Sequence, residues 1–208
     1  MTATKDYMFA KVAGFTCDID ALRRHFHATT PQFPATSYRD NRVDYIGWAV
    51  TSRDGSLEDG VRRIATKGAP GEQPNTKRGT TRTGVCTGAL ADTMDALEHY
   101  GFKPYRARLM ALTNEGEAMP FHTDSKEQTW RLHIPIITNP HCFFEWQRGD
   151  GTVESVHLPA DGSAWLVRVD INHRAVNFSG IASERVHLLM GLNDLPALSA
   201  IGTHNILV

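Results

Sequence analysis

The sequence predicts a mainly β fold, a sandwich or barrel of short strands with flanking helices. Beyond residue 104, short runs of apolar and β-branched residues alternate with turn signals, as is typical of all-β sandwiches and barrels. Before residue 100, apolar residues recur at helical spacing in two segments. We therefore expect residues 1–208 to form a single domain, with an N-terminal helical and strand portion over 1–100 and a barrel core over 104–192.

The N-terminal portion is expected to contain two strands and two helices. Residues 8–12 and 45–50 are short apolar strand candidates. Asp18 or Asp20 is expected to cap a helix that runs to about His27. A second helix is expected from Gly88 to Tyr100, where Gly101 would end it. The apolar faces of the two helices would carry Ile19, Leu22 and Phe26 in the first and Leu90, Met94 and Leu97 in the second.

Residues 52–87 differ in composition from the rest of the chain, because they are rich in Gly, Pro and Thr. A long loop in a compact domain is usually either functional or disordered. Two interpretations stay open. The segment is either a mobile surface loop or a lid over the substrate, with Arg78 or Arg82 contacting a carboxylate.

The barrel core is predicted from its strands. They are expected at 105–112, 130–138, 142–147, 153–158, 164–169, 174–178 and 186–192, with a hairpin turn at 149–151. In the strand that starts at residue 130, Arg131 and His133 share one face, and the apolar residues share the other. If the apolar face packs against the helices, Arg131 and His133 point into the barrel. The pattern alone leaves the reverse orientation equally open.

Three separated residues form a candidate metal-ligand set. His122 and Asp124 stand one residue apart, and His173 follows a later strand. Two imidazoles and one carboxylate can bind one face of Fe(II) and leave the other positions open. Arg185, shortly downstream, can bind the carboxylate of an acidic co-substrate through two parallel hydrogen bonds. A His-x-Asp pair also arises by chance, so a structural histidine and a surface cation are the alternatives.

Residues 104–192 resemble the aspartyl/asparaginyl β-hydroxylase family, in particular its small bacterial proline-hydroxylase-like members. The matching stretches are 119–124, 129–136, 158–165, 173–177 and 185–188. The resemblance implies a double-stranded β-helix, a jelly-roll or cupin-like barrel. It also implies Fe(II) bound by His122, Asp124 and His173, with 2-oxoglutarate and O2 as co-substrates.

The same resemblance assigns roles to three more residues. Arg185 would bind 2-oxoglutarate, and the pair Arg131 and His133 would help to hold it. Apart from the resemblance, Thr113 is a further candidate contact of the co-substrate, and a plain turn threonine is the alternative. His187 shares a face with Arg185 and is expected to be a core histidine or one that supports the site.

The expected activity is hydroxylation of an unactivated C–H bond, with release of succinate and CO2. The preferred substrate is a free amino acid or small amino-acid derivative. The alternatives are an Asp or Asn residue in a peptide or protein, a cupin-like module that binds a small acid without oxidation, and a metal-dependent hydrolase or isomerase.

Composition limits the other classes. The formal net charge is −1, so charge gives no case for nucleic acid as a partner. We find no signal-peptide pattern and no apolar run of membrane-spanning length. The three cysteines show no zinc-binding spacing, so reduced thiols and a cytoplasmic location are expected. The sequence does not indicate an oligomeric state.

Overall fold

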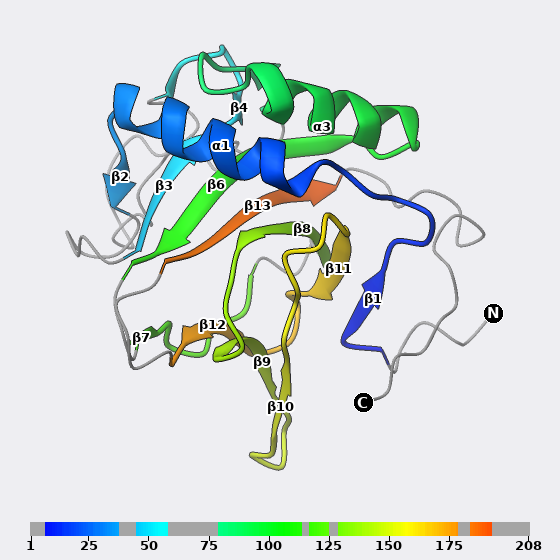
Figure 1. The fold of residues 1–208 in the computed structure, drawn as a ribbon. Coiled ribbons are helices and arrows are strands. Elements are labelled where there is room, and N and C mark those ends of the chain that lie inside the picture. The colour runs from blue at the N-terminus through cyan, green and yellow to red at the C-terminus, as the bar shows by residue number, and fades with distance from the viewer. Residues whose placement is uncertain are drawn as a thin grey trace, which may run out of the picture.

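Two antiparallel sheets face each other in the computed structural model, which describes residues 7–37, 45–57, 79–113, 117–124, 129–178 and 184–192. Helices α1 and α3 lie together over the outer face of the larger sheet, and the smaller sheet lies on its other side (Figure 1). The mainly β architecture with flanking helices that the sequence predicted is therefore confirmed.

Within the described ranges, the larger sheet has seven strands in the spatial order β1-β11-β8-β13-β6-β3-β2. Their bounds are Phe9–Lys11 (β1), Trp165–Arg168 (β11), Trp130–Ile137 (β8), Arg185–Leu192 (β13), Pro104–Leu112 (β6), Tyr45–Ala49 (β3) and Thr36–Ser37 (β2). The smaller sheet, counted over the same residues, has four strands in the order β10-β9-β12-β7. These are Val153–Val156 (β10), Cys142–Gln147 (β9), His173–Asn177 (β12) and Glu117–Ala118 (β7). Strands β4 (Thr51–Ser52) and β5 (Thr81–Arg82) form a separate pair.

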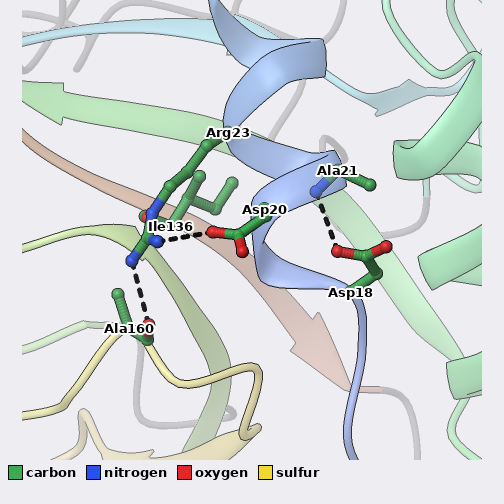
Figure 2. A network of polar contacts seen from close by, with 6 residues as sticks. All are labelled: Asp18, Asp20, Ala21, Arg23, Ile136 and Ala160. Atoms are coloured by element: carbon green, nitrogen blue, oxygen red, sulfur yellow. Dashed lines mark hydrogen bonds and ion pairs between the residues drawn. The ribbon is translucent and has the colours of Figure 1, made fainter.

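Helix α1 spans Ile19–Thr29 and begins as the sequence predicted. The Asp18 side chain accepts a hydrogen bond from the backbone N–H of Ala21 at 2.9 Å (Figure 2), which satisfies one of the open donors of the first turn. Leu22 and Phe26 are buried against the sheet. A 3-10 turn, η1 (Thr30–Gln32), follows.

Helix α3 spans Gly88–His99, and its Leu90, Met94 and Leu97 are buried in the same core as those of α1. Gly101 takes a φ of +88° directly after the helix, a conformation that glycine adopts without steric cost. Neither helix in the described part of the chain has the length and apolar character needed to cross a membrane.

The larger sheet separates an apolar outer face from a polar inner face. On β8, Leu132 and Ile134 belong to the core beneath the helices, together with Leu188 and Met190 of β13. Because side chains alternate along a strand, the neighbours of these residues point toward the smaller sheet. Arg131 and His133 therefore face inward, and of the two orientations left open by the sequence, the inward one is confirmed.

Strand β8 is irregular at Pro135, which has no backbone N–H to give to a neighbouring strand. The pairing with β13 shifts between Val186 and His187, so Ile136 is left over as an extra residue. Its carbonyl accepts a hydrogen bond from Nε of Arg23 on α1 at 2.9 Å. Arg23 also donates to the carbonyl of Ala160 at 3.0 Å, so one guanidinium ties α1 to β8 and to the segment before β11 (Figure 2).

The segment 52–87 is described only at its two ends, which contribute to the β4–β5 pair. Arg82, one of the two expected substrate contacts, instead forms ion pairs with Asp95 and Glu98 on α3. Residues 58–78, among them Arg78, lie outside the described residues, and the lid hypothesis concerns that part of the chain.

Replacement of Arg23 by Met is expected to destabilise the fold by about 1–3 kcal/mol, because the carbonyls of Ile136 and Ala160 lose a charged donor. The free energy of unfolding from urea titration measures this loss. Arg24→Met is the matched control on the same helix, since Arg24 is exposed and should change stability by less than about 0.5 kcal/mol. Equal stability of the two variants would contradict a structural role for the Arg23 contacts.

Candidate active site

Backbone pairing brings the two candidate imidazole ligands together. His122 and His173 form an antiparallel bridge: the N–H of His122 donates to the carbonyl of His173 at 3.0 Å, and the N–H of His173 donates to that of His122 at 2.8 Å. The N–H of Asp124 donates to the carbonyl of Val169 at 2.9 Å. Both rings lie on the same side of this bridge, with centroids 4.5 Å apart.

The side chains of His122, Asp124 and His173 converge as the sequence predicted. One candidate ligand atom from each lies within 4.8 Å of the other two, so together they could hold a metal ion. Nδ1 of His122 lies 2.9 Å from the carbonyl oxygen of Pro120, and Nδ1 of His173 lies 2.8 Å from that of Ile171. Each Nδ1 must donate to its carbonyl, which leaves both Nε2 lone pairs for a metal.

His173 is buried in an aromatic setting. The ring of Phe144 on β9 stacks on its imidazole, with centroids 5.3 Å apart and planes 11° apart. Burial, with a smaller contribution from the neighbouring His122, lowers the pKa of His173 to about 4. A neutral imidazole is the form that binds a metal, so this environment keeps His173 ready for one at neutral pH.

Arg131 reaches the carboxylate of the candidate ligand set. Its Nη2 lies 2.7 Å from Oδ2 of Asp124, and both side chains are largely buried. Burial lowers the pKa of Arg131, and Arg108 on β6 adds to that effect while Asp124 opposes it. The expected contact of Arg131 with a co-substrate is thus joined by one that the sequence did not suggest. The guanidinium orients Asp124.

A second polar cluster surrounds Arg185 on the inner face of the larger sheet. Arg185, His187 and His133 are only 4%, 1% and 4% exposed. Nη2 of Arg185 lies 3.3 Å from Nδ1 of His187, and Nδ1 of His133 lies 3.4 Å from the same atom. Burial lowers the pKa of Arg185 to about 10, so its guanidinium still carries a charge at neutral pH.

The two clusters are joined by side-chain contacts across the interior. The ring of His133 meets that of Phe144 edge-on at a centroid distance of 5.5 Å, and Phe144 stacks on His173. A continuous line of contacts therefore runs from Arg185 through the two buried histidines to the candidate metal ligands. The sequence had proposed the three metal ligands and had placed Arg185 and His187 on one strand face. It left the orientation of His133 open and expected Phe144 only in the barrel lining.

Thr113 follows β6 directly, one residue beyond Leu112, which pairs with Arg185 on β13. The residue is half-buried. The structure thus brings Thr113 to the same end of the barrel as Arg185, while its contact with a co-substrate stays a prediction.

Two features of the site were missed at the level of sequence. Arg108 is a buried cation on β6, and its position two residues from Arg106 in a period-2 strand could have indicated it. Phe121 covers the guanidinium of Arg174, with 4.3 Å between the guanidinium carbon and the ring centroid. Arg174 also forms an ion pair with Glu145 at 2.7 Å. Through its contact with Arg174, the segment that carries His122 is held against β12. No local sequence signal predicts such contacts.

The free energy of unfolding of the metal-free protein should decrease as the pH is lowered below about 6.5. Burial keeps the pKa of His133 and His187 well below the ordinary value and that of His173 at about 4. As the pH falls, these histidines bind protons in the unfolded chain before they do so in the folded protein. Their contribution to stability is therefore fully present above about pH 6.5. Below it, each of these histidines costs about 1.4 kcal/mol per pH unit until its folded-state pKa is reached.

Urea unfolding at several pH values between about 7.5 and 5.5 measures this slope. His141 is exposed, so His141→Gln should leave the slope unchanged. A stability that stays constant over this range would contradict the burial of neutral histidines.

No family model and no curated protein matches the chain. Solved structures do share its fold. An oxidoreductase of the 2OG-Fe(II) oxygenase family from Burkholderia pseudomallei aligns with a TM-score of 0.50 and 11% identity, over 82% of this chain and 76% of that one. A Trichoplax adhaerens prolyl hydroxylase, in complex with a peptide fragment of the hypoxia inducible factor oxygen degradation domain, aligns with a TM-score of 0.51 and 7% identity, over 89% and 83%. These likenesses confirm the double-stranded β-helix that the family resemblance implied.

Proposed function

We propose that the protein is an Fe(II)- and 2-oxoglutarate-dependent dioxygenase that hydroxylates an unactivated C–H bond. The observation that carries the proposal is the convergence of His122, Asp124 and His173, with ligand atoms within 4.8 Å of one another. Two imidazoles and one carboxylate with open positions are typical of non-haem Fe(II) oxygenases, whereas structural zinc sites usually have four ligands. The matching sequence stretches favour a relative of the aspartyl/asparaginyl β-hydroxylases within that class.

The buried guanidinium of Arg185 supports 2-oxoglutarate as the co-substrate. An isolated buried cation is costly unless an anion meets it, and a planar guanidinium matches a carboxylate through two hydrogen bonds. We assign the distal carboxylate of 2-oxoglutarate to Arg185 and its keto-acid end to the metal. Bound Fe(II), 2-oxoglutarate and O2 together would supply the oxidising chemistry, with succinate and CO2 as products.

The side chains of this protein would position the reactants and exclude water. The Nδ1–H groups of His122 and His173 donate to backbone carbonyls and so fix both rings with Nε2 toward the metal. Arg131 holds the Asp124 carboxylate in place. Phe144 covers one face of His173, which keeps the surroundings of the metal apolar.

A free amino acid or a small amino-acid derivative is the substrate class that we propose. Arg108 and Arg131 are inward-facing cations on the sheet that also carries Arg185, and Arg131 contacts Asp124. These charges favour a substrate that bears a carboxylate close to the metal. Hydroxylation of an Asp or Asn residue in a peptide is the alternative, and it is tested as a separate set of substrates.

The purified protein with Fe(II) should release succinate from 2-oxoglutarate when a screen reaches the correct substrate. The screen compares free amino acids, their small derivatives and short peptides that contain Asp or Asn. Succinate formation with free amino acids supports the proposed class, and formation only with peptides replaces it. A protein that binds 2-oxoglutarate but forms no succinate with any of them would be a non-oxidative binding module.

The variants His122→Ala and His173→Ala should each lose Fe(II) binding in anaerobic titration, because two ligands do not hold the ion as three do. Circular dichroism checks that the sheets are retained. His141→Ala is the matched control, since His141 is exposed and outside the ligand set. Undiminished Fe(II) affinity in either ligand variant would remove that residue from the site.

A further inference from the structure

His187 is a buried histidine to which the proposed chemistry gives no role. It lies on β13 two residues from Arg185, on the same inward face, and is 1% exposed. Its Nδ1 lies 3.3 Å from Nη2 of Arg185 and 3.4 Å from Nδ1 of His133. One ring nitrogen thus contacts two neighbouring polar groups.

The chemistry of these groups fixes the tautomer of His187. A guanidinium has only N–H donors, so Nδ1 of His187 must accept the hydrogen bond from Arg185. The proton of the neutral ring then sits on Nε2. A doubly protonated ring would set an N–H against a guanidinium N–H. Both burial and Arg185 disfavour that form, because they hold the pKa of His187 well below its ordinary value.

The same argument extends one residue further, to His133. Since Nδ1 of His187 is an acceptor, a hydrogen bond across the 3.4 Å contact has to be donated by Nδ1–H of His133, and the single lone pair of His187 Nδ1 is then shared between two donors. Nε2 of His133 then carries a lone pair. Nε2 of each histidine is buried and has no hydrogen-bond partner among the described residues. The pair therefore presents one buried donor, on His187, and one buried acceptor, on His133.

We propose that His187 is a positioning residue of the co-substrate site, whose Nδ1 lone pair fixes the Arg185 guanidinium so that its remaining N–H groups meet a distal carboxylate. This inference rests on the proposed function, in which Arg185 binds 2-oxoglutarate. An arginine side chain has several rotatable bonds, and a lone guanidinium would lose that freedom on binding. A fixed partner removes this cost before the ligand arrives. Apart from His187, the guanidinium of Arg185 has no hydrogen-bond partner within the part of the chain that the structure describes.

The geometry also gives His133 a narrower role than direct binding of a carboxylate. With its Nδ1–H directed at His187, its free ring nitrogen is an acceptor, and an acceptor repels a carboxylate oxygen. His133 therefore stabilises the position of His187 and leaves carboxylate binding to Arg185.

Variants at position 187 separate the two ring nitrogens. His187→Asn keeps an acceptor near the place of Nδ1, whereas His187→Gln puts its amide near the place of Nε2 and loses that acceptor. We expect His187→Gln to weaken anaerobic binding of 2-oxoglutarate to the Fe(II) protein by about tenfold or more, as for loss of a hydrogen bond to a charged group. His187→Asn should stay within about threefold of the unchanged protein.

The comparison acid is 2-oxobutyrate, which has the same keto-acid end but no distal carboxylate. Neither variant should change its affinity, because His187 acts only through Arg185. A loss of affinity for both acids in His187→Gln would mean general damage to the site and would overturn the positioning role. Equal affinity of His187→Gln and the unchanged protein for 2-oxoglutarate would overturn it as well.

A second measurement does not depend on variants or turnover. Two-bond 1H–15N correlation spectra of the metal-free protein, labelled at histidine, report which ring nitrogen carries the proton. We expect Nε2–H for His187 and Nδ1–H for His133. An Nδ1–H tautomer or an imidazolium at His187 overturns the inference even if the variants fail to fold.

Failure of the proposed function would look different. If the unchanged Fe(II) protein binds 2-oxoglutarate no better than 2-oxobutyrate, and Arg185→Lys changes neither, then Arg185 does not bind the distal carboxylate. Both proposals are supported together by two results. The histidines show the expected tautomers, and His187→Gln weakens the affinity for 2-oxoglutarate more than His187→Asn does, while the affinity for 2-oxobutyrate stays unchanged.

Discussion

The candidate centre depends on two backbone hydrogen bonds that His122 and His173 exchange. This bridge joins the segment before β8 to β12, and β12 in turn pairs with β9, which carries Phe144. The ligand side chains lie far apart in the sequence, so no local propensity could bring them within reach of one ion. Without the bridge, the Nδ1–H bonds that orient each ring would remain possible, but the two imidazoles would no longer share a metal.

The interior of the barrel is electrostatically expensive. Arg131 and Arg185 are charged groups taken out of water, and three histidines are held neutral by burial. Apolar residues of similar size would fill the same space at lower cost, so stability alone does not account for this composition. An acidic ligand would offset part of the cost and add its binding free energy to the folded state. The polar interior is thus consistent with a fold that is less stable when empty than when occupied.

Local patterns predicted much of this molecule. The helix faces marked by Leu22 and Leu90 are buried, and the alternation around Arg131 gave two orientations, of which one was realised. The two-residue strands β2 and β7 fell below any sequence signal, and the strand expected over 153–158 ends at Val156. The contact of Arg131 with Asp124 joins a strand to a preceding segment in space, which period and spacing do not encode. The sequence therefore identified the candidate functional residues. Which of them contact one another is determined by the tertiary structure.

Pro135 has a consequence for how strand β8 finds its place during folding. A one-residue slip of a strand exchanges its two faces, which here would turn Arg131 and His133 toward the helices and the apolar residues toward the site. Proline tolerates only a position where no ladder hydrogen bond is required of its nitrogen. The irregularity opposite Val186 and His187 supplies one such position, and β11 pairs with β8 only as far as His133. Pro135 therefore disfavours shifted pairings of β8 with its neighbouring strands. In this way it helps to set the register of the strand that carries Arg131.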